Sequence, residues 1–221
     1  MNAPIDIERA RFNMIEQQIR PWDVLDQSVL SLLSVVKRED FVPEAHRNLA
    51  FMDLEVPLPE GQCMLPPKTE ARLLQELQVH KHERVLEIGA GSGHMAALLA
   101  HKAQHVTTLE IRTALARYAA ERLKRAAVTN AEVVEADGAR GLPQRGPFDV
   151  ILLSGSVAAV PEALLEQLKV GGRLAAIVGM EPIMRAVLVR RDAPDGFHRV
   201  ELFDTVAPRL GGFAEPTAFS F

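Results

Sequence analysis

The amino-acid sequence predicts an α/β fold, in which a doubly wound and mostly parallel sheet of seven strands follows an N-terminal helical extension. From residue 81 onward, short apolar segments suited to strands alternate with helical segments, which is the order of βαβ units in a parallel sheet. The last two strand-like segments, MRAVLVRRD and HRVELFDTV, have the turn sequence APDG between them, which predicts an antiparallel hairpin at the sheet edge.

The length of 221 residues suits one domain, so we expect residues 1–221 to form a single unit. Within it we assign residues 1–80 to N-terminal helices and a loop, 81–206 to the sheet core and 207–221 to a C-terminal tail. The tail, APRLGGFAEPTAFSF, either folds over a pocket or packs on the core, and its composition does not decide between these.

Composition and charge argue against several classes of protein. A net charge of −4 and no long basic run disfavour a nucleic-acid binder, and no apolar run approaches the roughly 18 residues of a membrane span. A single cysteine excludes an internal disulfide, and the N-terminus carries acids and arginines where a signal peptide needs an apolar core. We therefore expect a cytoplasmic protein. The scattered histidines indicate no metal site, and nothing indicates the oligomeric state.

The N-terminal part contains three predicted helices. Apolar residues at helical spacing predict a helix over 5–19, and Asp26 is a suitable N-cap for a second helix over 26–36. Prolines interrupt the segment 38–62, which we expect to be mainly loop, and a third helix is predicted over 68–79.

The sheet core follows in regular order. Helices are predicted over 94–102, 113–127 and 161–168, with the proline at position 161 suited to a first helical turn. The turn sequence VGGR follows the last of these helices. The strands that precede the hairpin are predicted over 85–89, 105–111, 132–136, 148–153 and 174–178.

The sequence VLEIGAGSGH joins the first core strand to its helix. Gly89, Gly91 and Gly93 leave no side chain in the way of a ligand, so that backbone N–H groups and the helix N-terminus can face it. The spacing is G-x-G-x-G and departs from the G-x-G-x-x-G of dinucleotide binders. Glu87, inside the strand, either supports the turn or faces the amino-acid end of a cofactor.

Acidic residues end the next two strands. Glu110 lies 21 residues after Gly89, where a carboxylate accepts hydrogen bonds from both ribose hydroxyls of an adenosine. Asp137 and Gly138 close the third strand, where an acid and a backbone N–H suit an adenine ring. Because no phosphate-binding lysine or arginine lies in the glycine turn, these elements favour S-adenosyl-L-methionine over a dinucleotide. The alternative is that they are a structural turn and surface acids.

Several longer stretches give the chain a specific family resemblance from about residue 10 to about residue 206. They are MIEQQIR, REDFVPEAHRNLAFMD, PLPEGQ, VLEIGAGSGH, VVEADGARGLP, PFDVILLSGS and VPEALLEQLKVGGRLAAIVG. The chain resembles the protein-L-isoaspartate O-methyltransferases, which have a Rossmann-like class I methyltransferase fold. The resemblance implies methylation of the α-carboxyl group of L-isoaspartyl residues in damaged proteins, the first step of their repair.

The resemblance also implies site residues and partners. S-adenosyl-L-methionine would be held by Gly89, Gly91, Glu110, Asp137 and Gly138, and we add Glu87 and Gly93 from the glycine motif. A protein or peptide carrying isoaspartyl would be the substrate, with no nucleic acid or membrane as partner. Gln62 and the loop that follows it would line the acceptor site.

The acceptor loop departs from the family pattern Gly-Gln-Thr-x-Ser-x-Pro. Cys63 stands at the position of the threonine, apolar Met64 follows, and Leu65 stands at the position of the family's catalytic serine. Both hydroxyls are therefore absent. We hypothesise that Ser154 or Ser156, at the end of the fourth strand, partly replaces the missing serine; the alternative is that they cap the strand end.

Three interpretations remain open. The first is an isoaspartyl carboxyl methyltransferase. The second keeps cofactor and fold but has a different acceptor, and the third is a weakly catalytic protein that binds S-adenosyl-L-methionine. A carboxylate is already ionised at neutral pH, so the lack of a histidine or lysine base in the motifs does not count against the first interpretation.

Overall fold

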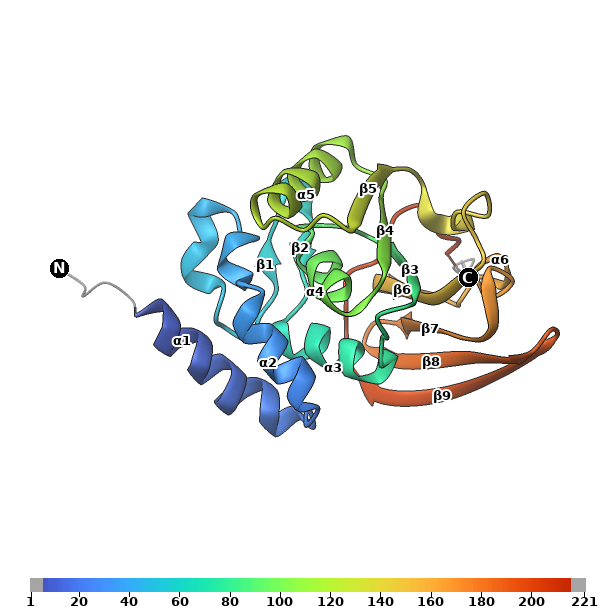
Figure 1. Ribbon diagram of the computed structural model, residues 1–221, viewed down its shortest axis with the longest axis horizontal. Helices are drawn as coiled ribbons and strands as arrows, with labels where there is room; N and C mark the ends of the chain where they lie inside the picture. Colours follow the sequence, from blue (N-terminus) through green and yellow to red (C-terminus); the bar gives the residue numbers. More distant parts are fainter. Residues whose placement is uncertain (1–5, 216–221) are drawn as a thin grey trace, which may run out of the picture.

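The computed structural model describes residues 6–215 and confirms the predicted α/β fold (Figure 1). One seven-stranded sheet has the order β5-β4-β3-β6-β7-β8-β9, parallel from β5 to β7 and antiparallel at β8 and β9. The strands are β3 (Arg84–Ile88), β4 (His105–Glu110), β5 (Ala131–Glu135), β6 (Phe148–Val157), β7 (Leu168–Met180), β8 (Ile183–Ala193) and β9 (Gly196–Asp204). The predicted start of the first helix at residue 5 and the end of the tail, 216–221, lie outside the described residues.

Helices occupy the predicted segments. They are α1 (Ile7–Asn13), continued by a π-helix (Met14–Ile19) and a 3₁₀ turn (Arg20–Trp22), then α2 (Gln27–Val35), α3 (Pro67–Leu77), α4 (His94–Lys102), α5 (Thr113–Arg125) and α6 (Glu162–Leu165). Asp26 is the N-cap of α2 as predicted, because its Oδ1 accepts a hydrogen bond from the Ser28 backbone N at 2.7 Å.

The two faces of the sheet bury separate apolar clusters. Side chains alternate along β3, so Val85 packs in the cluster under α1 to α5, whereas Leu86 and Ile88 pack in the cluster on the opposite face. Figure 1 shows α2 and the π-helix that continues α1, both in blue, beside α3. The opposite face is covered by α6, by a 3₁₀ turn (Gly138–Arg140) and by the chain around Leu210.

The helix predicted over 161–168 is much shorter in the structure. It spans only Glu162–Leu165, because the carbonyl of Gln167 accepts a hydrogen bond from the Phe148 N at 2.8 Å and Leu168 already pairs with β6. The predicted VGGR turn accordingly lies inside β7. Pairing of two buried strands has prevailed over local helix propensity.

The segment 38–62, which was predicted to be mainly loop because of its prolines, contains short helices and the first strand of a pair. Its 3₁₀ helices are Arg38–Asp40, Glu44–Leu49 and Pro59–Gly61. Strand β1 (Val56–Pro57) pairs antiparallel with β2 (Cys63–Met64), and the Leu58 N donates to the Gln62 carbonyl at 2.7 Å. The acceptor loop is therefore a tight hairpin packed on the core.

The strand order places a ligand site at one edge of the sheet. The order reverses between β3 and β6, and ligands of open α/β sheets bind beyond the carboxyl ends of strands at such a switch point. Gly89 follows β3, and Ser154 lies where the register of β6 shifts.

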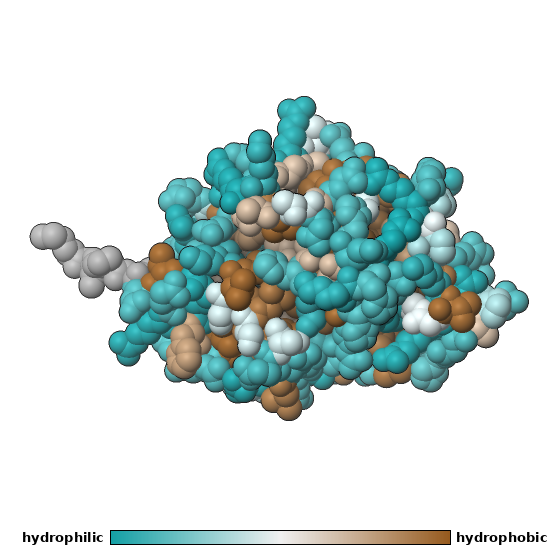
Figure 2. Space-filling view, viewed as in Figure 1, coloured by the Kyte–Doolittle hydropathy of each residue, from teal (hydrophilic) through white to brown (hydrophobic). Residues whose placement is uncertain are grey.

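Figure 2 shows a largely hydrophilic face with separate apolar spots. No helix within residues 6–215 has the length and apolar character to cross a membrane.

Candidate active site

The glycine turn after β3 is fastened to the end of β4. The backbone N atoms of Gly89 and Ala90 both donate to the Leu109 carbonyl, at 2.9 and 3.1 Å. Gly91 has a φ of +52°, and a Cβ added there would meet only Leu58, at 3.5 Å, so one side of the turn is open. Gly93 has another purpose: a Cβ there would lie 3.1 Å from the Ala119 carbonyl of α5. Gly93 therefore allows helix packing and does not line the cavity.

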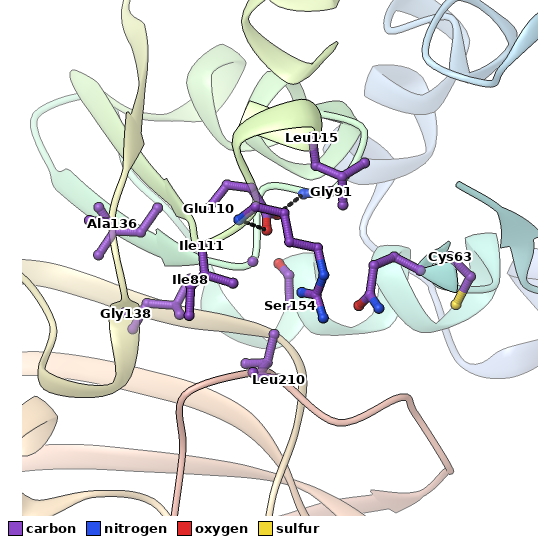
Figure 3. Close-up of a pocket in the computed structure, with 15 residues that line it drawn as sticks. Cys63, Ile88, Gly91, Glu110, Ile111, Leu115, Ala136, Gly138, Ser154 and Leu210 are labelled. Atoms are coloured by element: carbon purple, nitrogen blue, oxygen red, sulfur yellow. Dashed lines mark hydrogen bonds between the residues drawn. The ribbon is translucent and has the colours of Figure 1, made fainter. Parts of the chain in front are cut away.

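Glu110 ends β4 and faces the turn, as Figure 3 shows. Its Oε2 accepts a hydrogen bond from the Gly91 N at 3.0 Å, and its Oε1 accepts one from the Arg112 N at 3.1 Å. Each carboxylate oxygen has room for another donor. Glu110 is 4% exposed yet lines a cavity, so its contact with a ligand there stays a prediction.

The end of the third strand differs in part from the expectation. Gly138 lines the cavity, and a Cβ there would lie 2.3 Å from Ile88, so close packing on β3 requires glycine. The Asp137 carboxylate caps the 3₁₀ turn that follows it, accepting from the Ala139 N at 2.9 Å. Gly212 packs against this carboxylate. Asp137 thus lies at the rim, and its contact with an adenine stays a prediction.

Glu87 is a fully buried carboxylate beneath the turn. The Ser154 hydroxyl donates to its Oε1 at 2.7 Å, and its Oε2 has no hydrogen-bond partner among the described residues. Burial raises the pKa of Glu87 to about 7, against the hydrogen bond from Ser154 that lowers it, and Glu70 and Glu110 raise it further. A buried carboxylate oxygen without a donor suits the cationic amino group of an amino-acid ligand.

The raised pKa of Glu87 predicts a specific pH dependence. Between the ordinary pKa of 4.5 and the folded value of about 7, the folded state binds more protons than the unfolded state, so stability falls as pH rises. The full shift corresponds to about 3 kcal/mol. We expect Glu87→Gln, which cannot titrate, to gain about this much over wild type between about pH 4 and about pH 8, measured by urea unfolding. Parallel pH profiles would contradict the prediction.

The acceptor-loop residues lie beside the cofactor elements. Gln62 and Cys63 line the same cavity as Gly89, Glu110 and Ser154, which we call the cofactor cavity. Cys63, Met64 and Leu65 line an adjoining cavity, which we call the acceptor cavity. Four residues line both cavities, which therefore adjoin: Cys63, Gly89, Gly91 and Ser154. We refer to the two adjoining cavities together as the cleft. Burial raises the pKa of the Cys63 thiol to about 12, with Glu55 and Glu70 adding to the effect, so Cys63 is a protonated wall residue.

Leu65 is held in place by a buried ionic network that the sequence did not indicate. The Arg38 Nη2 donates to the Leu65 carbonyl at 2.7 Å, and the Arg38 Nη1 forms an ion pair with Glu70. His94 Nδ1 lies 3.0 Å from the same Glu70 oxygen. Burial alone would raise the pKa of Glu70, but Arg38 and His94 keep that pKa below its ordinary value. No signal in the sequence pointed to this network, because Arg38 lies in a short 3₁₀ turn of charged residues and Glu70 in a helix with several other charged residues.

The two serines of the fourth strand have separate roles. Ser154 lines both cavities, whereas the Ser156 hydroxyl is fully buried and donates to the Ala207 carbonyl at 2.7 Å. The Leu210 N then donates to the Ser156 carbonyl at 2.9 Å, which brings Leu210 and Gly211 into the wall of the cofactor cavity. The described part of the tail therefore does both things that the sequence left open: Leu210 and Gly211 line the cofactor cavity, and Ala207 packs in the core. Of the two serines, only Ser154 lines the cavities.

Comparisons with known protein sequences consistently find one family. The family model described as protein-L-isoaspartate(D-aspartate) O-methyltransferase matches residues 9–202. A protein-L-isoaspartate O-methyltransferase of Methanoculleus marisnigri is 40% identical over 185 residues, covering 83% of this chain and 84% of the relative. One from Rhodopseudomonas palustris strain HaA2 is 40% identical over 203 residues, covering 91% of this chain and 83% of the relative.

Solved structures of such enzymes share the fold. A protein of this kind from Plasmodium falciparum, crystallised with S-adenosyl-L-homocysteine, superposes with a TM-score of 0.80 at 19% identity, covering 94% of this chain and 99% of that one. A second protein-L-isoaspartate O-methyltransferase gives a TM-score of 0.77 at 23% identity, covering 93% of this chain and 66% of that one. With the glycine turn, Glu110 and the acceptor hairpin in one cleft, the chain belongs to the protein-L-isoaspartate O-methyltransferase family.

Proposed function

We propose that this protein transfers a methyl group from S-adenosyl-L-methionine to the α-carboxyl group of L-isoaspartyl residues in damaged proteins or peptides. The observation that carries the proposal is the pair of adjoining cavities, in which the glycine turn and Glu110 lie beside Gln62 of the acceptor hairpin. Family membership supports the acceptor class. We also propose a cytoplasmic location, which suits a chain with a single cysteine.

The residues present fit the cofactor. Glu110 has acceptor positions left for ribose hydroxyls, the turn is open at Gly91, and the unpartnered Oε2 of Glu87 suits the amino group of the methionine part. We assign cofactor binding to Glu87, Gly89, Gly91, Glu110 and Gly138, with Asp137 at the rim. When bound, S-adenosyl-L-methionine would supply a methyl group on a sulfonium, which the acceptor carboxylate attacks in line with S-adenosyl-L-homocysteine as the neutral leaving group.

The protein contributes position and electrostatics and needs no general base. An acceptor carboxylate is ionised at neutral pH, so no proton has to be removed before it attacks. The acceptor hairpin and the segment around Leu210 restrict the cleft, which brings acceptor and methyl donor together and limits water. Ser154 borders both cavities, and we propose that its hydroxyl orients groups at their junction.

Labelled methyl transfer tests the function directly. The substrates are an isoaspartyl peptide and its twin containing ordinary aspartate, with S-adenosyl-L-methionine as donor. Transfer to the isoaspartyl peptide alone is the expected result. Transfer to neither peptide, with S-adenosyl-L-homocysteine still bound, would favour a different acceptor or a weakly catalytic binding protein and would overturn the proposal.

Position 65 predicts a gain of activity. Leu65 is 6% exposed and borders the acceptor cavity, where it offers no hydrogen bond to a carboxylate. A hydrogen bond to a charged group contributes about 1.5–3 kcal/mol, so we expect Leu65→Ser to raise kcat/KM for the isoaspartyl peptide by up to about 10- to 150-fold. Leu65→Ala is the matched control, because it removes the same apolar bulk without adding a hydroxyl. Equal rates for the two variants would contradict the prediction.

A further inference from the structure

The cleft is lined by several carboxylates and one cation. Glu110 lines the cofactor cavity, and Glu70 and Glu87 line the acceptor cavity, whereas Arg112 is the only lysine or arginine among the described residues that line either. An acceptor that enters as a carboxylate meets like charges there unless a cation lies within reach. Arg38, which neutralises Glu70, is 2% exposed and does not line either cavity.

The backbone of Arg112 is fixed by a hydrogen bond, whereas its guanidinium forms no hydrogen bond with the described residues. It is the N-cap residue of α5, directly after β4, and its backbone N donates to Glu110. The one ionic contact of its side chain within residues 6–215 is with Glu60 of the acceptor hairpin, where Nε and Oε2 are 3.8 Å apart. This separation is too long for a hydrogen bond. The guanidinium N–H groups are therefore available to a ligand.

The guanidinium lies between two segments that both line the cofactor cavity, one through Gln62 and Cys63 and the other through Leu210 and Gly211. The first is the hairpin that carries Glu60, and the second is the tail, where a Cβ on Gly211 would lie 3.8 Å from the Arg112 Nη1. The side chain is 28% exposed, so it is neither buried nor free in solvent. Glu60 has a φ of +57°, which places its carboxylate beside Arg112 at some backbone strain.

We propose that Arg112 binds the carboxylate of the acceptor, which displaces Glu60 from the guanidinium, and so determines selectivity for an anionic acceptor. This inference rests on the proposed function. A guanidinium presents paired N–H donors that match a carboxylate, and such charge-assisted pairs are stronger than neutral hydrogen bonds. Arg112 thereby supplies at the cleft the donor that apolar Leu65 does not provide.

S-adenosyl-L-methionine also carries a carboxylate, so the experiment must distinguish binding of the acceptor carboxylate from binding of the cofactor carboxylate. Arg112→Gln removes the charge but keeps a polar side chain, and Arg117→Gln is the matched control, an exposed arginine on the same helix outside both cavities. For each variant the peptide KM is measured by methyl transfer, and the Kd of S-adenosyl-L-homocysteine by calorimetry.

We expect Arg112→Gln to raise the peptide KM by about 10- to 100-fold, with the Kd of S-adenosyl-L-homocysteine within about twofold of wild type. Arg112→Lys should recover part of the loss, and Glu60→Gln, which removes the competing carboxylate, should lower the peptide KM. An unchanged peptide KM in Arg112→Gln would overturn the inference. A raised Kd for S-adenosyl-L-homocysteine with an unchanged peptide KM would do the same and would place Arg112 on the cofactor.

Failure of the proposed function can be distinguished from failure of the inference about Arg112. If wild type transfers no methyl group to the isoaspartyl peptide, the proposed function fails irrespective of Arg112. Calorimetric binding of that peptide to the complex with S-adenosyl-L-homocysteine then decides the inference. Binding that weakens about 10-fold or more in Arg112→Gln and stays unchanged in Arg117→Gln supports it, and no binding or equal binding overturns it.

Discussion

Glu110→Ala should weaken the binding of S-adenosyl-L-homocysteine by about 100- to 10,000-fold. The Glu110 carboxylate is buried and has acceptor positions for two ribose hydroxyls, and each hydrogen bond to a charged group contributes about 1.5–3 kcal/mol. The variant also leaves the Gly91 N and the Arg112 N without the acceptor that fixes the turn. Isothermal titration calorimetry measures the change directly.

Two further variants make the Glu110 experiment specific. Glu110→Gln keeps the shape and one acceptor oxygen but loses the charge, and we expect an intermediate loss of affinity. Glu135→Ala is the matched control, because Glu135 is the exposed partner of Glu110 on the neighbouring strand β5 and lies outside the cavity. Unchanged affinity in Glu110→Ala would contradict the placement of the cofactor in this cleft.

Arg38→Met should destabilise the protein by about 3–5 kcal/mol, because it leaves the buried Glu70 carboxylate without its guanidinium partner. It also removes the donor to the Leu65 carbonyl, so the acceptor hairpin loses an anchor. A typical domain has about 5–15 kcal/mol of stability in total, so the effect is large. Urea unfolding at neutral pH measures it, and a loss below about 1 kcal/mol would contradict the prediction.

The double variant Arg38→Met with Glu70→Leu distinguishes the cost of an unpaired charge from the value of the ion pair. Replacing both partners by apolar side chains leaves neither member of the pair as an unpaired buried charge, so we expect most of the stability lost in the single variant to return. The Leu65 carbonyl still lacks its donor in the double variant. We therefore expect its kcat/KM for the isoaspartyl peptide to remain below wild type even when its stability has recovered.

The fold and the cofactor elements were accessible from local patterns. Alternating apolar segments, the glycine turn and the spacing of Glu110 depend on residues close to each other in the chain, so they predicted the sheet and the cofactor class. The helix after residue 160 was overestimated, because the pairing of Leu168 with Phe148 in β6 joins segments distant in sequence. Gly93 and Asp137 illustrate the same point. The sequence analysis assigned both to the cofactor, whereas in the structure Gly93 packs against α5 and the Asp137 carboxylate caps the 3₁₀ turn that follows it.

Local sequence was therefore enough to predict the sheet, the glycine turn and the acidic strand ends, because each depends on short-range periodicity and backbone geometry. Contacts between distant segments decided the rest. The network of Arg38, Glu70 and His94 spans 56 residues, and the meeting of Arg112 with Glu60 depends on how the hairpin packs. Buried charges require partners, and only the tertiary fold determines which side chains come close enough to be those partners.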